Sequence, residues 1–172
     1  MDQIEVNPGD QKIDYSGSIL YAEGIAENFA VAIYDPTARK TTLTVSVGPE
    51  LSTVNDCLDF AIRNSPDFSK LEILIAGGVR TNKPRDQSYE GVESCDPDDQ
   101  DLHFEYGLQP QEDLNELCKM NWEAIMRQNH YGLRANQIQY VGQDLRDGEI
   151  KVEVDPRKNK PTAQHFLGIH EQ

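Results

Sequence analysis

The sequence contains few of the residues that build disulfide-linked, zinc-binding or membrane-spanning proteins. Its 172 residues include three cysteines, Cys57, Cys95 and Cys118, and no two of them form a Cys-x-x-Cys pair. An odd number of widely spaced thiols argues against a disulfide framework or a zinc site and is typical of the reducing cytosol. No apolar run reaches the roughly 20 residues needed to cross a bilayer, and the first residues lack the regions of a signal peptide. We therefore expect a cytoplasmic protein that does not bind a membrane.

Basic residues are also scarce. The sequence has 16 Lys and Arg against 30 Asp and Glu, which gives a formal net charge of −14. Nucleic acids and anionic membranes are bound by clustered Lys and Arg, so we expect neither as a partner. A partner protein with a basic surface is compatible with this charge. We expect no metal and no cofactor: the acidic run at 96–101 lacks the Gly and the bidentate Glu of a calcium loop, and no glycine-rich loop with Lys follows Gly77-Gly78.

Hydrophobic patterning predicts an alternation of strands and helices. The predicted strands are 18–21, 29–34, 40–47 and 71–76, the predicted helices are 51–64 and 112–129, and a final hairpin joins 137–141 to 149–154 across 144–148. The run from Phe29 to Tyr34 is apolar at every position and ends at Asp35-Pro36, which is typical of a strand buried on both faces. Ser52 is the predicted N-cap of the first helix.

This pattern and the chain length predict a single α/β domain. We place the domain at residues 18–155. Residues 1–17 are polar and are predicted to be a loosely ordered N-terminal lead-in, and residues 156–172 are predicted to be a C-terminal tail.

An acidic segment interrupts the domain at residues 86–116. It carries eleven acidic residues and no Lys or Arg, and it shows no sustained hydrophobic period. Such a segment is usually a solvated loop held open by charge repulsion. Two alternatives are an interaction arm for a basic partner and a lid over a nearby site.

Two segments resemble the family of the chemoreceptor glutamine deamidase CheD. Residues 24–36, G-I-A-E-N-F-A-V-A-I-Y-D-P, resemble the family signature G-x-G-S-C-V-A-V-x-x-Y-D-P. The strand 71–76 with Gly77-Gly78 is similar to the strand and Gly-Gly that follow the first helix in CheD-like proteins and in the N-terminal asparagine amidohydrolase. The resemblance covers residues 18–155 in its order of elements. It implies a CheD-like α/β sandwich with a mixed β-sheet and two main helices, and amide hydrolysis as the family activity.

At the positions that the resemblance aligns with the family's catalytic residues, this sequence has residues that cannot perform the catalytic roles. It aligns the nucleophilic Cys with Asn28, the general-base His with Val45 and a Thr with Ala22. An amide nitrogen shares its lone pair with the carbonyl and cannot replace a thiolate, and a nucleophile without its base is not activated. The resemblance therefore implies a catalytically inactive CheD-like protein that serves as a protein-binding or regulatory module.

The predicted binding site is the turn before the buried strand. We expect Glu23, Glu27 and Asn28 to border a shallow, negative pocket with Val45 behind them. Such a pocket suits the recognition of an amide or a basic side chain without chemical attack, because an Asn side chain both donates and accepts hydrogen bonds.

Two other functional hypotheses remain open. One is a glutamine deamidase or asparagine amidohydrolase with a relocated nucleophile, for which Cys95 is the candidate although its acidic neighbours disfavour a thiolate. The other is a secreted bacterial effector that binds a host protein, because effectors reuse the CheD-type fold.

Overall fold

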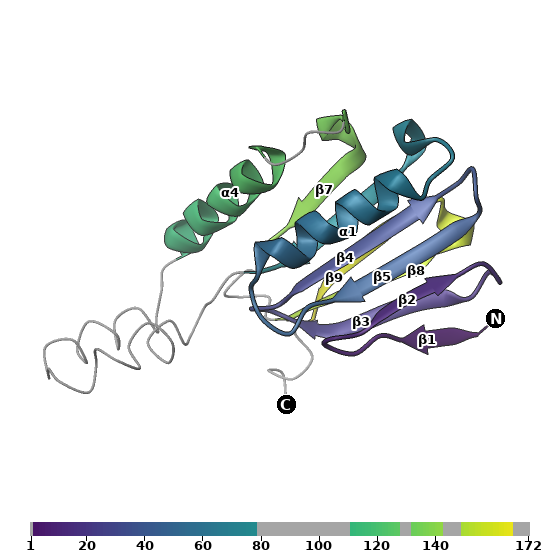
Figure 1. Ribbon diagram of the computed structural model, residues 1–172. Coiled ribbons are helices and arrows are strands. Elements are labelled where there is room, and N and C mark those ends of the chain that lie inside the picture. Colours follow the sequence, from purple (N-terminus) through teal and green to yellow (C-terminus); the bar gives the residue numbers. More distant parts are fainter. Residues whose placement is uncertain (1, 79–110, 128–131, 143–148, 167–172) are drawn as a thin grey trace, which may run out of the picture.

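The computed structural model describes residues 2–78, 111–127, 132–142 and 149–166, and in 111–117 and at 166 it describes the backbone alone. Within these residues the chain is an α/β sandwich of two helices and two mixed sheets (Figure 1). The four-stranded sheet has the order β1 (Gln3–Glu5), β3 (Ile19–Ile25), β8 (Glu149–Asp155), β9 (Lys160–Phe166). The five-stranded sheet has the order β2 (Gln11–Asp14), β5 (Lys40–Val45), β4 (Phe29–Asp35), β6 (Glu72–Gly77), β7 (Ile138–Val141). The pairs β1–β3 and β6–β7 are parallel, and the other pairs are antiparallel.

Both helices pack on one face of the five-stranded sheet. They are α1 (Leu51–Arg63) and α4 (Gln111–Arg127), and short 3-10 turns lie at Phe68–Lys70 (η1), Ala135–Gln137 (η3) and Pro156–Lys158 (η4). The four-stranded sheet covers the opposite face, so that the five-stranded sheet is the middle layer (Figure 1). Among the described residues, no helix is both long enough and apolar enough to span a membrane.

The central strand β4 explains the apolar run of the sequence. Phe29, Val31 and Ile33 pack against the helices, in a cluster that includes Leu58 and Ile125. The alternate residues of β4, by contrast, pack against the four-stranded sheet. Because successive side chains of a strand point to opposite faces, a middle-layer strand must be apolar at every position. Every residue of β4 is buried, so the prediction of a strand buried on both faces is confirmed.

The prediction that residues 1–17 form a loosely ordered lead-in is wrong, because this segment contains two strands. β1 pairs in parallel with β3, and β2 pairs with β5, so both sheets gain an edge strand from this segment. Val6 also lies in the core between the sheets, with 4% of its surface exposed. Edge strands this short owe their order to main-chain hydrogen bonds with a neighbour, and their side chains carry little hydrophobic pattern.

The hairpin predicted between 137–141 and 149–154 is also wrong. β7 belongs to the five-stranded sheet and β8 to the four-stranded sheet. The actual hairpin joins β8 to β9, which lies in the predicted tail. Its turn contains Asn159 in the left-handed region, and Arg157 bonds Asp155 at 2.8 Å and lowers the pKa of that carboxyl.

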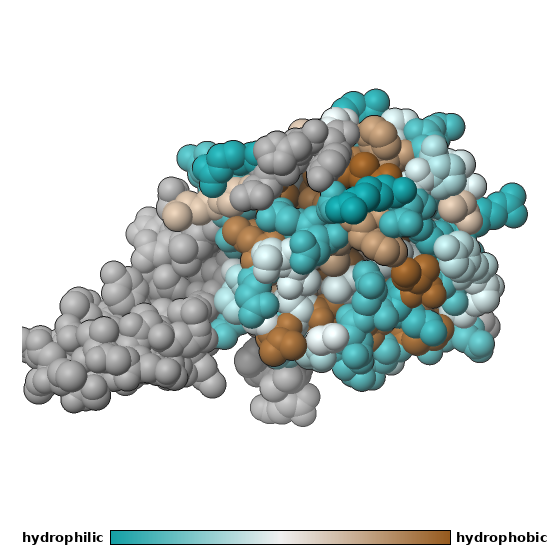
Figure 2. Space-filling view, in the orientation of Figure 1, coloured by the Kyte–Doolittle hydropathy of each residue, from teal (hydrophilic) through white to brown (hydrophobic). Residues whose placement is uncertain are grey.

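The helices begin and end close to their predicted limits, but two details differ. Glu50 is the N-cap residue of α1, without a side-chain capping bond, so the prediction of Ser52 is wrong. β5 ends at Val45, two residues earlier than predicted, and Val47 is 76% exposed. On the face that carries α1, Figure 2 shows hydrophobic residues in separate small groups among polar ones. Exposed apolar residues scattered in this way need no binding partner to explain them.

Candidate functional site

The turn from β3 to β4 lies at one end of the molecule, and we call this end the Asn28 end. β4 begins here at Phe29, Ser46 follows the last residue of β5, and β6 ends here at Gly77. These three strands are neighbours in the five-stranded sheet. The strand order therefore brings together segments that are far apart in the sequence.

The side chain of Asn28 is hydrogen-bonded within this end. Its Oδ1 accepts from the Ala26 N–H at 3.2 Å, and its Nδ2 donates to the Ser46 carbonyl at 3.1 Å. The buried Ser46 hydroxyl accepts from the Phe29 N–H at 2.7 Å and donates to the Gly48 carbonyl at 2.6 Å. Asn28 thus fixes the turn to the end of β5, and its amide keeps one N–H and one lone pair for a ligand.

The Gly77-Gly78 pair connects this turn to α4 and β7. The Gly78 N–H is shared between the carbonyls of Ala26 and Asn28, both at 3.0 Å. Tyr140 Oη donates to the Gly77 carbonyl at 2.5 Å, and Asn121 Nδ2 donates to the Gly78 carbonyl at 3.1 Å.

Tyr140 and Asn121 were not predicted as residues of this end. The sequence offered one signal for each: Asn121 is a polar residue on the apolar side of the second helix, and Tyr140 is an amphipathic residue in the strand that follows. Burial raises the pKa of Tyr140 well above its ordinary value, so its hydroxyl stays a neutral donor at physiological pH.

The structure separates the predicted residues into two environments. Ala22 and Val45 are each 1% exposed and belong to the apolar core between the sheets. Glu23 is exposed, and Glu27 and Asn28 are half-buried. The three predicted binding residues therefore reach the surface, whereas the positions aligned with the base and the Thr do not. The role of Glu23, Glu27 and Asn28 in binding stays a prediction.

Cys95 lies outside the described residues, as do residues 86–110 of the predicted acidic loop. The remainder of that loop, residues 111–116, forms the first turns of α4, so the prediction of a loop is wrong there and the overlapping prediction of a helix from residue 112 is confirmed. In the part of the chain that the structure describes, no group of three or more His, Cys, Asp or Glu side chains could hold a metal ion.

Acidic side chains gather at the Asn28 end. Glu149 begins β8, and its carboxylate lies near Gly24, so that it joins Glu23 and Glu27 on this part of the surface. The β4–β5 turn, the C-terminus of α1 and the three 3-10 turns lie at the opposite end. Seven basic residues belong to these segments: Arg39, Arg63, Lys70, Arg134, Arg157, Lys158 and Lys160. Acids lie at that end as well, and four of these basic residues form ion pairs with them: Arg63 with Asp59, Lys70 with Asp67, Arg157 with Asp155 and Lys158 with Glu153. Glu23, Glu27 and Glu149 form no ion pair with a described residue, so the acidic charge at the Asn28 end is unpaired within the described part of the chain.

Replacing Asn28 with Ala should lower the free energy of unfolding by about 1–2 kcal/mol. The variant loses two hydrogen bonds that join the turn to β5, and it leaves the partly buried Ser46 carbonyl without this donor. Urea denaturation followed by circular dichroism would measure the change. The exposed Glu23→Ala variant, which loses no such bond, should stay within about 0.5 kcal/mol of the parent. Equal stability of Asn28→Ala and the parent would contradict a structural role for this amide.

Comparisons with known proteins identify no family for this chain. No protein-family model matches it, and no curated protein matches it. Among solved structures it is similar to the crystal structure of the Bacillus licheniformis hypothetical protein YfiH, with 16% sequence identity and a TM-score of 0.42. The match covers 76% of this chain and 49% of that protein, so the chain spans about half the length of the structure it matches.

Proposed function

We propose that this protein is a CheD-like protein that has lost amide-hydrolysing chemistry and acts in the cytoplasm as a protein-binding or regulatory module. The observation that carries the proposal is the residue at position 28 and the hydrogen bonds that it makes. The resemblance puts the family nucleophile there, and this chain has an amide whose oxygen and nitrogen both bond the protein's own backbone. That side chain serves the fold and offers no nucleophile.

The position that the resemblance aligns with the family's general base also lacks a titratable side chain. A base must come within hydrogen-bond reach of the group that it activates. The aligned base position is Val45, which is buried and apolar. The neighbouring hydroxyl, Ser46 Oγ, is buried and donates to a backbone carbonyl, so it is not paired with a group that could take its proton. These two features favour binding over amide hydrolysis as the function of the Asn28 end.

The charge distribution supports a partner with a basic surface. Glu23, Glu27 and Glu149 give the Asn28 end acidic charge that no described Lys or Arg pairs, whereas most of the Lys and Arg at the other end form ion pairs with acids there. Such an asymmetric field orients an approaching charged protein and raises its association rate. It favours a basic partner surface at the Asn28 end over any other orientation.

The double variant Glu23→Gln/Glu27→Gln should bind its partner about tenfold more weakly at low salt, because each removed rim charge is worth roughly 0.5–1 kcal/mol. The partner would be identified by capture on the immobilised parent protein from an extract of the source cell. Its affinity for parent and variant would then be measured by titration calorimetry. Both acids lie at the surface, and neither side chain forms a hydrogen bond or ion pair with another described residue, so the thermal midpoint should stay nearly unchanged.

A matched control removes two acids elsewhere. Asp2→Asn/Glu72→Gln takes the same charge from the opposite end of the strands and should leave the affinity within about twofold of the parent. Equal weakening by both variants would show that the loss of affinity comes from the change in net charge alone, and it would contradict binding at Glu23 and Glu27.

The loss of catalysis is tested separately by ammonia release from proteins and peptides that contain glutamine or asparagine. We expect no turnover above background. Turnover that persists in Asn28→Ala and disappears in Cys95→Ser would contradict the proposal and would assign the activity to a relocated nucleophile.

A further inference from the structure

A small, mostly enclosed cavity lies beneath the C-terminal half of α1, away from the Asn28 end. Its volume is about 10 Å³. Asp35, Lys40 and Thr42 line it from the sheet, and Cys57, Phe60 and Ala61 line it from the helix. This end of β4 and β5 lies in the middle layer, so side chains on the helix-covered face are shielded from solvent.

Two opposite charges are buried at this cavity. Asp35 is 0% exposed and Lys40 is 7% exposed, and the two residues face each other as a cross-strand pair of β4 and β5. Their side chains nevertheless form no ion pair, since no Lys40 nitrogen lies within 4.0 Å of an Asp35 oxygen. The two opposite charges therefore attract each other without direct contact.

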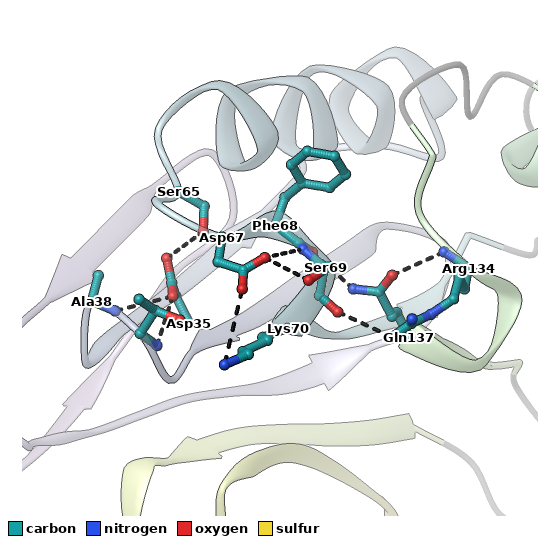
Figure 3. Close-up of polar contacts among 10 residues, drawn as sticks. Asp35, Ala38, Ser65, Asp67, Phe68, Ser69, Lys70, Arg134 and Gln137 are labelled. Atoms are coloured by element: carbon teal, nitrogen blue, oxygen red, sulfur yellow. Dashed lines mark hydrogen bonds and ion pairs between the residues drawn. The ribbon is translucent and has the colours of Figure 1, made fainter.

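The Asp35 carboxylate already accepts three hydrogen bonds, none of them from Lys40. Its Oδ1 accepts from the N–H groups of Thr37 and Ala38, both at 3.1 Å, and its Oδ2 accepts from the Ser65 hydroxyl at 2.7 Å (Figure 3). Two carboxylate oxygens offer about four lone-pair positions, so room remains for one more donor.

The Lys40 ammonium has fewer partners. Its Nζ donates to the carbonyl of Asn64, the C-cap residue of α1, over 3.4 Å. A cation at a helix C-terminus is favourable, but this distance exceeds the usual 2.7–3.2 Å of an N–H···O bond. An ammonium has three donors, and a buried charge is costly unless those donors are satisfied.

We propose that this cavity binds one ordered water molecule, which accepts from the Lys40 ammonium, donates to the Asp35 carboxylate and makes the two charges a water-bridged pair. A volume of about 10 Å³ is close to the minimum that one water needs, and a cavity lined by several polar groups is hydrated where an apolar one stays dry. The Thr42 hydroxyl, also on the cavity wall, is the third partner. The volume excludes larger ligands.

A crystal structure of the full chain at roughly 1.5 Å would test the site directly. We expect one water peak within hydrogen-bond distance of both Lys40 Nζ and an Asp35 carboxylate oxygen. A cavity without density, or a direct contact between Lys40 Nζ and an Asp35 oxygen, would overturn the proposal.

Solution NMR provides a second readout in a folded variant. In the ¹⁵N-labelled parent, a long-lived water should give a cross-peak to a backbone amide beside the cavity, such as that of Thr42. Thr42→Val keeps the side-chain shape and removes one polar partner, so this cross-peak should weaken or vanish. Thr42→Ser keeps the hydroxyl and should retain it. The absence of the cross-peak in the parent would contradict the proposed water, and its full retention in Thr42→Val would contradict Thr42 as the third partner.

Discussion

Replacing Gly77 with Ala should lower the free energy of unfolding by roughly 3–5 kcal/mol, the sum of left-handed backbone strain and forced overpacking. Gly77 has φ +85°, and a Cβ at this position would overlap the carbonyl oxygen of Asn28. It would also lie 2.7 Å from Ile25 Cγ2 and 3.1 Å from the Ala26 carbonyl oxygen. The two carbonyls cannot withdraw freely, because both accept the Gly78 N–H. Urea denaturation followed by circular dichroism would measure the loss.

Gly17 provides the matched control for this variant. It has φ +90°, so it pays a comparable backbone strain when it is replaced, but a Cβ there would meet nothing within 4 Å. Gly17→Ala should therefore cost only about 1–2 kcal/mol. The difference between the two variants isolates the steric contribution at the Asn28 end. Equal losses would contradict the close packing of β6 against the turn.

The elements predicted correctly from the sequence are those with strong hydrophobic periodicity. The apolar run of β4 and the helical stripe of α1, with Val54 and Leu58 buried, are local signals that require one arrangement. The sheet that β7 joins and the pairing of β9 depend on contacts far apart in the sequence. Local periodicity does not encode these contacts, and adjacency along the chain favoured a hairpin that the layers do not allow.

In the candidate site, too, the features with a local sequence signal were predicted and those that depend on distant contacts were not. Asn28 was located correctly at the entrance to the buried strand, because a turn followed by an apolar run is a local pattern. Its partner, the Ser46 carbonyl, follows a different strand, and the bonds of Asn121 and Tyr140 to the Gly77-Gly78 pair come from still other elements. These contacts arise only where the ends of several strands meet, which the sequence pattern cannot locate.

Replacing Asp35 with Ala should lower the free energy of unfolding by about 3 kcal/mol, because a buried network loses its acceptor and its donors stay buried. The carboxylate organises the β4–β5 turn through the N–H groups of Thr37 and Ala38, and it holds Ser65, which follows α1, through the hydroxyl (Figure 3). The aspartate of the Tyr34-Asp35-Pro36 segment is thus a structural residue in this protein. Chemical denaturation of the purified variant would give the change.

Two further variants separate the contributions of this carboxylate. Asp35→Asn keeps an oxygen that can accept from the turn and an amide that can donate to Ser65 Oγ, but it leaves the buried Lys40 ammonium without its opposite charge, so it should cost about 2 kcal/mol. Ser65→Ala removes one bond and should also cost about 1 kcal/mol. Because Asp35 and Ser65 are in contact, the double variant Asp35→Ala/Ser65→Ala should cost less than the sum of the single variants. Strict additivity, or a loss below about 1 kcal/mol for Asp35→Ala, would show that the turn and the end of α1 are held by other contacts.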